Sequence, residues 1–325
     1  MVISLHFKSV GSEINIFSIP PEILANILEN VYPYVNESFI RISLVSKEIE
    51  SRLQKAVPYV ESMSVRKIVA LQLFSGVKHV KILNNWISMR KFRMDIWKNV
   101  ESMVFVKDVF QLYEKDFIES EDGSRCLKYS FFMPKLRILE IRDSLTVRTN
   151  LNQDVIPNLR VLNVFNSTIH DSLKFNHLKI LRIYNSAIRM DTWKNLEELS
   201  LDNVEYSFMF DFNNTLNIPS LQRLTVKDTY YPPISTVNLE ELILDNSMIL
   251  YPGAKNMKRV IPNELTFLQM VQFIDTSKYP ALKILKIKEC PGAIVSASNL
   301  VEITVDNCPG INIEEGLHKF VKSLN

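Results

Sequence analysis

The sequence predicts an α/β solenoid: a row of stacked repeats around one parallel β-sheet, preceded by a short helical segment and closed by a helix. Three observations support this prediction. A nine-residue pattern recurs along most of the chain, residues 16–53 show helical periodicity, and the last residues form an amphipathic stretch. We therefore divide the chain into a helical segment, residues 1–56, and a solenoid, residues 57–325.

The recurring pattern has apolar residues at its first, fourth and sixth positions and a small or polar residue at its ninth. Its clear copies are LRILEIRDS from Leu136, LRVLNVFNS from Leu159, LKILRIYNS from Leu178, LEELSLDNV from Leu196, LQRLTVKDT from Leu221, LEELILDNS from Leu239, LKILKIKEC from Leu282 and LVEITVDNC from Leu300. Weaker copies begin at Val60, Val77 and Val100, and the spacing implies a degenerate copy near Met257. The series resembles the leucine-rich-repeat family, and so many copies in register make the resemblance specific.

Side chains at the fourth and sixth positions point the same way, because a strand has a period of two residues. They should fill a core shared by neighbouring repeats, since one repeat cannot bury its own apolar face. The ninth residue, often Asn, Ser, Thr or Cys, is placed to satisfy backbone groups where the chain leaves the strand. We expect one curved parallel sheet from about Val57 to Ile311, with these residues buried: Leu139, Ile141, Leu162, Val164, Leu181, Ile183, Leu199 and Leu201.

The spacing of the copies constrains the returning half of each repeat. From Leu136 to Leu239, successive copies begin 18 to 25 residues apart, which leaves little room for a full helix. We expect extended or single-turn returns, with helical pieces only in the longer repeats. The gap between Val100 and Leu136 is too long for one repeat, so we interpret residues 109–132 as an insertion with an acidic, glycine-containing tip.

The C-terminal end is predicted to carry a capping helix over residues 313–324. Asn312 and Glu315 have the spacing of a capping box. An apolar stripe at helical spacing follows, formed by Ile313, Leu317, Phe320, Val321 and Leu324. Such a helix would close the open end of the solenoid.

Residues 16–53 show helical periodicity and no copy of the repeat. The stretch SIPPEILANILENV places prolines where a helix begins, and ESFIRISLVSKEIESRL continues as a second amphipathic helix. The order Ile19-Pro20-Pro21-Glu22-Ile23-Leu24, then Ile27-Leu28, then Leu44-Val45-Ser46-Lys47 resembles an F-box motif. Two positions depart from the usual pattern: Ile19 replaces Leu, and Ile49 stands where many members have Trp. Both remain apolar.

The F-box resemblance implies a function. F-box proteins with leucine-rich repeats are substrate-recognition subunits of SCF-type ubiquitin ligases: the F-box docks on a Skp-type adaptor, which bridges to a cullin, and the repeats hold a target protein. The resemblance implies that the adaptor-binding surface is formed by Ile19, Pro20, Pro21, Glu22, Ile23, Leu24, Ile27, Leu28, Val45, Ser46 and Lys47. Such a protein supplies proximity and leaves the chemistry to other subunits.

Two alternatives to this function stay open. The two helices could simply be the N-terminal cap of the solenoid. The chain could also be a structural scaffold subunit, free or bound to a Skp-type adaptor, without a role in ubiquitin transfer.

The exposed, concave face of the predicted sheet is the expected place for a target protein, whose identity the sequence leaves unknown. Two aromatic residues and two arginines fall on neighbouring strands of this face, and these are the residue types that protein interfaces favour. The target-binding candidates are Arg142, Phe165, Arg182 and Tyr184. Further along, charges of alternating sign are expected to form cross-strand ladders that hold the sheet in register: Asp202, Lys227, Asp245, Lys288 and Asp306.

Composition argues against an enzyme and against a nucleic-acid binder. The net charge is +2, the five histidines are scattered, and the seven glycines form no phosphate loop. We therefore expect no catalytic, cofactor-binding or metal-binding residues. The three cysteines form no CxxC pair, and the chain has neither a signal-peptide pattern nor an apolar run of about 20 residues. We expect no membrane association and a cytoplasmic or nuclear location.

Overall fold

The computed structural model describes the main sheet and its turns, and only parts of the remaining chain. The described residues are 19–23, 51, 62–65, 77–83, 98–106, 117–119, 125–127, 133–144, 153, 156–169, 175–188, 193–206, 216–231, 234–249, 276–290 and 292–324. Over these residues the chain is a parallel β-solenoid with little helix.

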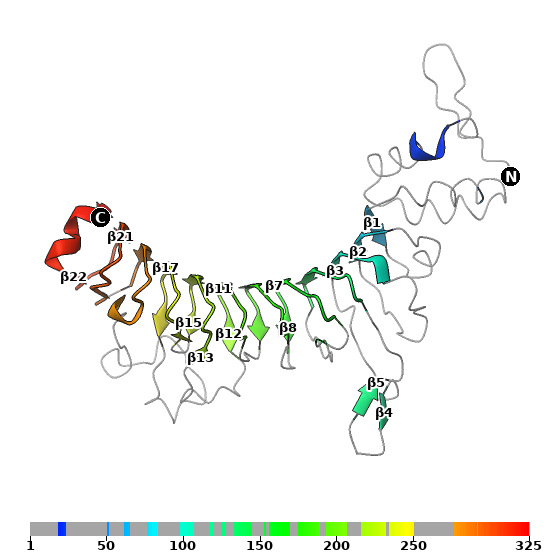
Figure 1. Cartoon of the computed structure of the whole chain (residues 1–325), viewed down its shortest axis with the longest axis horizontal. Coiled ribbons are helices and arrows are strands. Elements are labelled where there is room, and N and C mark those ends of the chain that lie inside the picture. The colour runs from blue at the N-terminus through cyan, green and yellow to red at the C-terminus, as the bar shows by residue number, and fades with distance from the viewer. Residues whose placement is uncertain are drawn as a thin grey trace, which may run out of the picture.

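One sheet runs along the length of the solenoid, with every strand parallel to its neighbours. Its 12 strands, in spatial order, are β1 (Ser62–Val65), β2 (His79–Leu83), β3 (Ser102–Val106), β6 (Ile138–Arg142), β7 (Val161–Phe165), β9 (Ile180–Tyr184), β11 (Glu198–Asp202), β14 (Arg223–Lys227), β17 (Glu241–Asp245), β19 (Ile284–Lys288), β21 (Glu302–Asp306) and β23 (Val321–Leu324). Figure 1 shows these strands side by side in a curved row. The predicted single parallel sheet is confirmed, including strands at the weaker copies that begin at Val60, Val77 and Val100.

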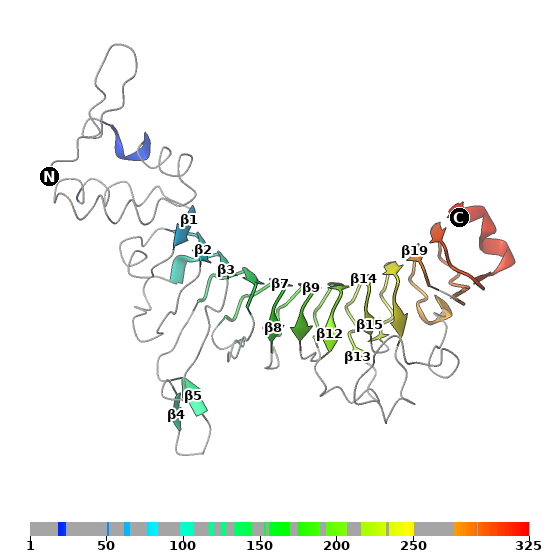
Figure 2. The same cartoon turned by 180° about the vertical axis from the view of Figure 1, so that it is seen from behind.

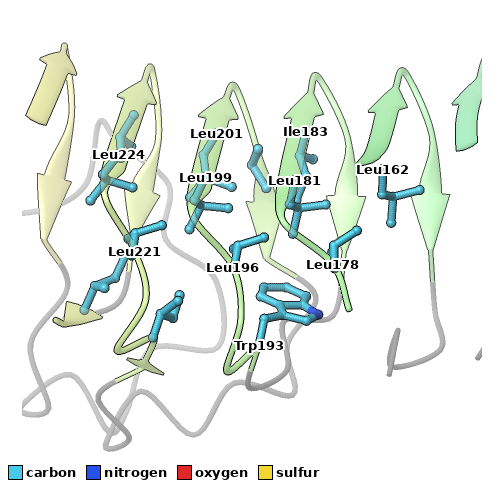
Figure 3. Close-up of a cluster of buried hydrophobic side chains, with 14 of the residues drawn as sticks. Leu162, Leu178, Leu181, Ile183, Trp193, Leu196, Leu199, Leu201, Leu221 and Leu224 are labelled. Atoms are coloured by element: carbon cyan, nitrogen blue, oxygen red, sulfur yellow. The ribbon is translucent and has the colours of Figure 1, made fainter. Parts of the chain in front are cut away.

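Burial alternates along the strands as the two-residue period requires. In β7, β9, β11 and β17 the second and fourth residues are buried, and the first, third and fifth lie partly exposed on the opposite face. All eight predicted core residues are fully buried at 0% exposure. Figure 3 shows how Leu181 and Ile183 of one repeat stack beside Leu199 and Leu201 of the next. The core is therefore continuous from repeat to repeat, as the sequence predicts.

A second row of buried residues closes the core at the start of each repeat. The residue three places before the first leucine is buried and its carbonyl accepts a hydrogen bond from that leucine, as between Trp193 and Leu196 at 3.4 Å. Figure 3 shows the Trp193 ring below Leu178 and Leu196. The large ring fills the space where the returning chain turns into the strand, so this turn belongs to the core as much as to the surface.

The returning halves contain short parallel strands, which confirms the expected extended returns. β8 (Thr168–Ile169), β10 (Ala187–Ile188) and β12 (Glu205–Tyr206) form a small sheet of their own. Further pairs are β13 (Leu216–Asn217) with β16 (Ile234–Ser235), β15 (Tyr230–Tyr231) with β18 (Met248–Ile249), and β20 (Ile294–Val295) with β22 (Asn312–Ile313). Figure 2 shows β8 and β12 below the row of long strands. The described 3₁₀ turn η7 (Thr276–Lys278) precedes β19, and the longer returns after β6 and β12 lie mostly outside the described residues.

Each of the long strands from β6 to β21 ends in a turn with the same backbone conformation. The residue in the eighth position of the repeat has positive φ, for example 47° at Asn166, 45° at Asn185 and 48° at Asn203. The asparagines form a ladder, because Asn185 Nδ2 donates to Asn166 Oδ1 and Asn203 Nδ2 donates to Asn185 Oδ1, both at 2.9 Å. Asparagine tolerates the left-handed conformation better than most residues, so it suits this position.

The side chain of the ninth residue points into the turn and forms hydrogen bonds with backbone groups, as predicted. The Ser186 hydroxyl donates to the Tyr184 carbonyl at 2.6 Å, and the Ser167 amide donates to Ser186 Oγ at 3.0 Å. Cys308 acts similarly, with the Cys290 amide 3.4 Å from its Sγ. One small polar side chain thus satisfies groups of two neighbouring repeats.

The predicted capping helix over residues 313–324 is wrong. Ile313 belongs to β22, residues Glu315–Phe320 form the 3₁₀ helix η8, and Val321–Leu324 form β23, which pairs with β21. The predicted capping box is also wrong, because Asn312 lies in β22 and the residue before η8, Glu314, makes no side-chain cap hydrogen bond. The end of the sheet offers unpaired backbone groups, and a strand satisfies them where a helix cannot. The predicted apolar stripe still covers the core through the buried Leu317 and the partly buried Ile313, Phe320 and Val321.

Three other predictions fall largely outside the described residues. Within the proposed insertion 109–132, β4 (Phe117–Glu119) and β5 (Arg125–Leu127) pair as an antiparallel hairpin. In the N-terminal segment, residues 21–23 are helical, beginning at Pro21, and residue 51 is helical. The residues of the degenerate copy near Met257 lie outside the described residues, but β17 pairs directly with β19, so the prediction of a further repeat between these two strands is wrong.

Candidate functional site

The outward face of β6, β7 and β9 carries the candidate target-binding residues. We use "outward face" for the side chains at the first, third and fifth positions of the long strands. On β6, β7 and β9 the first positions are Ile138, Val161 and Ile180, which pair in register across the sheet. Ile138 is 41% exposed. An apolar row therefore lies along one side of this face.

The fifth positions of the same strands form a continuous stack. The Phe165 and Tyr184 rings are parallel within 5°, with centroids 4.8 Å apart, and the Arg142 guanidinium lies 4.6 Å from the centroid of the Phe165 ring. The separation of the rings matches the spacing of neighbouring strands, about 4.8 Å, so the sheet itself sets the stacking distance. We call Arg142, Phe165 and Tyr184 the aromatic row.

Ion pairs hold the arginines of this face in place. Arg142 Nε hydrogen-bonds Glu140 Oε1 on the same strand. Arg182 Nη2 lies 2.7 Å from Glu198 Oε1, and Arg223 Nη2 lies 2.8 Å from Glu198 Oε2. Glu198 thus bridges β9 and β14 from β11, and the fourth candidate residue, Arg182, is drawn toward Glu198 and is not part of the aromatic row.

Glu198 belongs to this surface but is not among the predicted target-binding residues. Burial raises the pKa of its carboxyl group, but hydrogen bonds from Arg223 and Arg182 and their positive charges outweigh that effect, so the pKa lies below its ordinary value. Its side chain is 16% exposed. The sequence does indicate this pair. Glu198 and Arg223 occupy the same position in two consecutive repeats, so the strand register makes them neighbours.

An unsatisfied acceptor lies at the centre of the face. Asn163 sits on β7 between Glu140 on β6 and Arg182 on β9 in the strand register. Its Oδ1 atom is buried and has no hydrogen-bond partner among the described residues. A buried acceptor left in this state costs about 1–3 kcal/mol.

The predicted charge ladders are confirmed in position but not as ion pairs. Asp202, Lys227 and Asp245 are neighbours in register on β11, β14 and β17. Within the described part of the chain, no ion pair joins them, because Lys227 Nζ lies 4.0 Å from Asp228 in the following turn. Lys288 likewise lies 3.8 Å from Glu289 and does not pair with Asp306. Adjacent turn carboxylates compete successfully for these flexible ammonium groups.

A polar hollow opens at the ends of β7, β9 and β11. It is lined by Asn166, Ser167, Thr168, Asn185, Ser186, Ala187 and Asn203. The side-chain ladders of the turns already use these amides and hydroxyls. The hollow is therefore a product of the turn structure, next to the aromatic row.

The adaptor-binding prediction is only partly covered by the described residues. Ile19 is partly buried and packs against the core, Pro20 and Glu22 are exposed, and Pro21 is partly exposed. Ile23 is 49% exposed, a high value for a large apolar side chain. The remaining predicted residues, Leu24, Ile27, Leu28, Val45, Ser46 and Lys47, lie outside the described residues.

The described residues contain no group of three or more His, Cys, Asp or Glu side chains placed to hold a metal ion. None of the described helices is long and apolar enough to cross a membrane. Cys290 and Cys308 are free and buried; burial raises the pKa of the Cys290 thiol to about 11, and burial also raises that of Cys308. Such thiols are poor nucleophiles at neutral pH.

No protein-family model matches this chain, and no curated protein matches its sequence. The leucine-rich-repeat and F-box resemblances therefore rest on the sequence motifs alone. What the structure defines is a class: the chain is a parallel β-solenoid whose exposed sheet face carries an ordered row of aromatic and cationic side chains.

Proposed function

We propose that this chain is a protein-recognition module and that its target binds the outward face of β6, β7 and β9. The observation that supports this most is the aromatic row, in which Arg142, Phe165 and Tyr184 lie side by side on an exposed sheet. Binding energy at protein interfaces concentrates in aromatic and arginine side chains of this kind. The apolar row of Ile138, Val161 and Ile180 extends the same surface.

The surface is also ordered before a target arrives. Stacking fixes the two rings, and the ion pairs to Glu140 and Glu198 fix the two arginines. Side chains that are already immobilised lose less conformational entropy on binding, so more of the contact energy appears as affinity. An open sheet face with rigid, large side chains suits a folded protein or an extended segment better than a small molecule, which needs an enclosed pocket.

The finer proposal is that the module is a substrate-recognition subunit of an SCF-type ubiquitin ligase. In such a ligase, the leucine-rich repeats would bind the target. Residues 1–56 would dock as an F-box on a Skp-type adaptor, which binds a cullin. Three observations support it: the F-box resemblance of the sequence, the helical turn that begins at Pro21, and the exposed Ile23. The chain would perform no catalysis and would act in the cytoplasm or nucleus by raising the local concentration of target lysines.

The experiment compares proteins captured by tagged full-length chain and by two double variants. Phe165→Ala with Tyr184→Ala removes the rings of the aromatic row, and we expect about tenfold or greater loss of a specific set of partners. Recovery of the adaptor should not change, because the variant leaves residues 1–56 intact. The matched control, Ile243→Ala with Ile284→Ala, alters outward residues of β17 and β19 and should keep every partner.

The outcomes separate the parts of the proposal. Co-purification of both a cullin and a Skp-type adaptor would support the ligase, whereas an adaptor without a cullin would favour a scaffold subunit. If the Phe165 and Tyr184 variant captures the same partners as the unmodified protein, the target does not bind this face. Residues 109–132 would then become the next candidate.

A further inference from the structure

We propose that the Tyr184 ring and the Asp202 carboxylate together receive an arginine side chain of the bound protein. This inference rests on the proposed function, since it assumes that a target protein covers the outward face of the sheet. It adds the chemistry of one contact: a guanidinium that stacks on Tyr184 and pairs with Asp202.

The order of the side chains along the sheet leaves one face of Tyr184 open. In strand register, Arg142, Phe165, Tyr184 and Asp202 follow one another on β6, β7, β9 and β11. Arg142 covers one face of Phe165, and the other face of Phe165 stacks on Tyr184. The second face of Tyr184 is therefore turned toward Asp202, and among the described side chains no second ring or cation lies over it.

The Asp202 carboxylate has no cation of its own. Among the described side chains, no lysine or arginine lies within ion-pair distance of it. Its neighbours are engaged elsewhere: Arg182 is 2.7 Å from Glu198, and Lys227 is nearer to Asp228. Asp202 therefore has no ion-pair partner among the described side chains, although Lys227 is its register neighbour, and it lies beside an open aromatic face.

The dimensions suit a guanidinium. A tyrosine ring extends further from the sheet than the short aspartate side chain, and their strands are about 4.8 Å apart. A cation resting on the Asp202 carboxylate would lie about as far from the Tyr184 ring, within the roughly 6 Å over which cation–π attraction acts. Arginine suits the position better than lysine, because its planar group stacks on an aromatic face while it donates two hydrogen bonds to a carboxylate.

The partner's arginine would complete a pattern already present in the row. At the β6 end, the stack is closed by a cation, Arg142, which is itself paired with a carboxylate, Glu140. At the β11 end, the carboxylate Asp202 is present and the cation is missing. An acidic partner group is disfavoured here, since Glu140 and Glu198 already neutralise the arginines of the face.

Asp245 provides a matched control within the same row. It is also an aspartate at the fifth position of a strand, and its register neighbours are Lys227 and Lys288. It lacks an aromatic neighbour, so it should bind a guanidinium no better than an ordinary surface carboxylate. Asp202 and Asp245 thus share Lys227 as a register neighbour and differ in the other one, which is Tyr184 for Asp202 and Lys288 for Asp245.

The test uses full-length protein that carries 3-fluorotyrosine and that is co-expressed with a Skp-type adaptor if the chain alone is poorly soluble. The probe is N-acetyl-arginine amide. The fluorine signal of Tyr184, assigned with Tyr184→Phe, should shift saturably as the probe is added at low salt. N-acetyl-citrulline amide, which has the same shape without the charge, should cause no saturable shift. Asp202→Asn should weaken arginine binding about fivefold or more, and Asp245→Asn should leave it unchanged. The other tyrosine signals report that each variant remains folded.

Three results would overturn the inference: no saturable shift in the unmodified protein, equal binding by Asp202→Asn, or equal or tighter binding of N-acetyl-lysine amide. The titration needs no target protein, so its failure is separate from failure of the proposed function. Loss of targets by the Phe165 and Tyr184 variant without an arginine response would reject this contact alone. An arginine response with unchanged target capture would reject the target-binding role of the face.

Discussion

At the scale of single residues, Asn185 shows how the turn positions stabilise the solenoid. Its φ is 45°, and its side chain donates to Asn166 and accepts from Asn203. We predict that Asn185→Ala lowers the free energy of unfolding by about 1–2 kcal/mol, because alanine must adopt the left-handed conformation without these bonds. Asn185→Gly loses the same bonds but adopts the conformation freely, so its loss should be smaller.

Urea denaturation of the two Asn185 variants measures this difference. The predicted order of stability is unmodified protein, then Asn185→Gly, then Asn185→Ala. Because Asn185 is exposed, packing contributes little to the comparison. Equal stability of the two variants would show that the backbone conformation carries no cost at this turn.

Leu181 represents the core residues. It is 0% exposed and lies between Leu162 and Leu199 in the strand register. We predict that Leu181→Ala lowers the free energy of unfolding by about 2–5 kcal/mol, through lost burial and the cavity left behind. The adjacent Ile180→Ala, which alters the outward face, serves as control and should cost less than about 1 kcal/mol. Similar losses for the two variants would contradict the assignment of inward and outward faces.

Residue patterns predict the core well and the turns only partly. Leu181 and Ile183 are identified by the two-residue period alone, since burial on one side of a strand is a local consequence of sequence. The ninth-position serines are also predicted, because their chemistry fits one role. The left-handed conformation at Asn166 and Asn185 was not predicted, although Asn and Asp recur at the eighth position and tolerate that conformation.

At the scale of elements, Glu198 links three strands through Arg182 and Arg223. Its pKa is lowered in the folded protein, so the unfolded chain takes up a proton at higher pH than the folded chain does. Its contribution to stability is therefore fully present above the pKa of an unfolded glutamate, and it is lost as pH falls through the lowered folded pKa. We predict that Glu198→Gln costs about 1 kcal/mol at pH 7, near the upper end for exposed pairs.

The pH dependence is the decisive part of the Glu198 measurement. The difference in stability between the unmodified protein and Glu198→Gln should shrink as the pH is lowered from 7 toward 3. Glu241→Gln is the matched control, because Glu241 occupies the same strand position on β17 beside Arg223, which bonds Glu198 instead. A constant difference across this pH range would mean that the carboxylate charge is not what stabilises the site.

The C-terminal cap shows why a sequence pattern can identify the residues that pack against the core and still predict the wrong secondary structure for them. Leu317 and Phe320 are spaced as on a helix, and the structure does pack them against the core. The pattern alone cannot distinguish an α-helix from a 3₁₀ turn followed by a strand, because both bring these residues to one side. The choice depends on the unpaired edge of β21, which β23 satisfies and which no local pattern reveals.

At the scale of the whole molecule, the candidate surface exists only because repeats stack in register. Phe165 and Tyr184 occupy the same position of neighbouring repeats, so the sequence could predict that they would be neighbours. It could not predict the parallel stacking, the position of Arg142 over Phe165, or the diversion of Arg182 to Glu198. Those outcomes depend on competition among side chains from several repeats, which only the assembled sheet determines.

The last prediction concerns residues 1–56 and tests the functional proposal as a whole. Two short helices cannot bury the apolar faces predicted for residues 16–53 wholly against each other, and Ile23 is 49% exposed. We predict that the full-length chain expressed alone is poorly soluble and that co-expression with a Skp-type adaptor restores it, because binding stabilises the folded form. Deleting residues 1–56 should abolish adaptor binding and spare the repeats, as measured by co-purification and by circular dichroism.

A point variant makes the adaptor prediction sharper than the deletion does. Ile23→Asp places a charge on the predicted adaptor surface and should weaken adaptor binding by about tenfold or more, since it leaves a charge unpaired in an apolar contact. Val237→Asp is the matched control, because Val237 is 64% exposed but belongs to the solenoid. It should bind the adaptor as the unmodified protein does. If the full-length chain is instead soluble, monomeric and indifferent to the adaptor, residues 16–53 are only a cap, and the ligase proposal fails while the solenoid and its aromatic row remain.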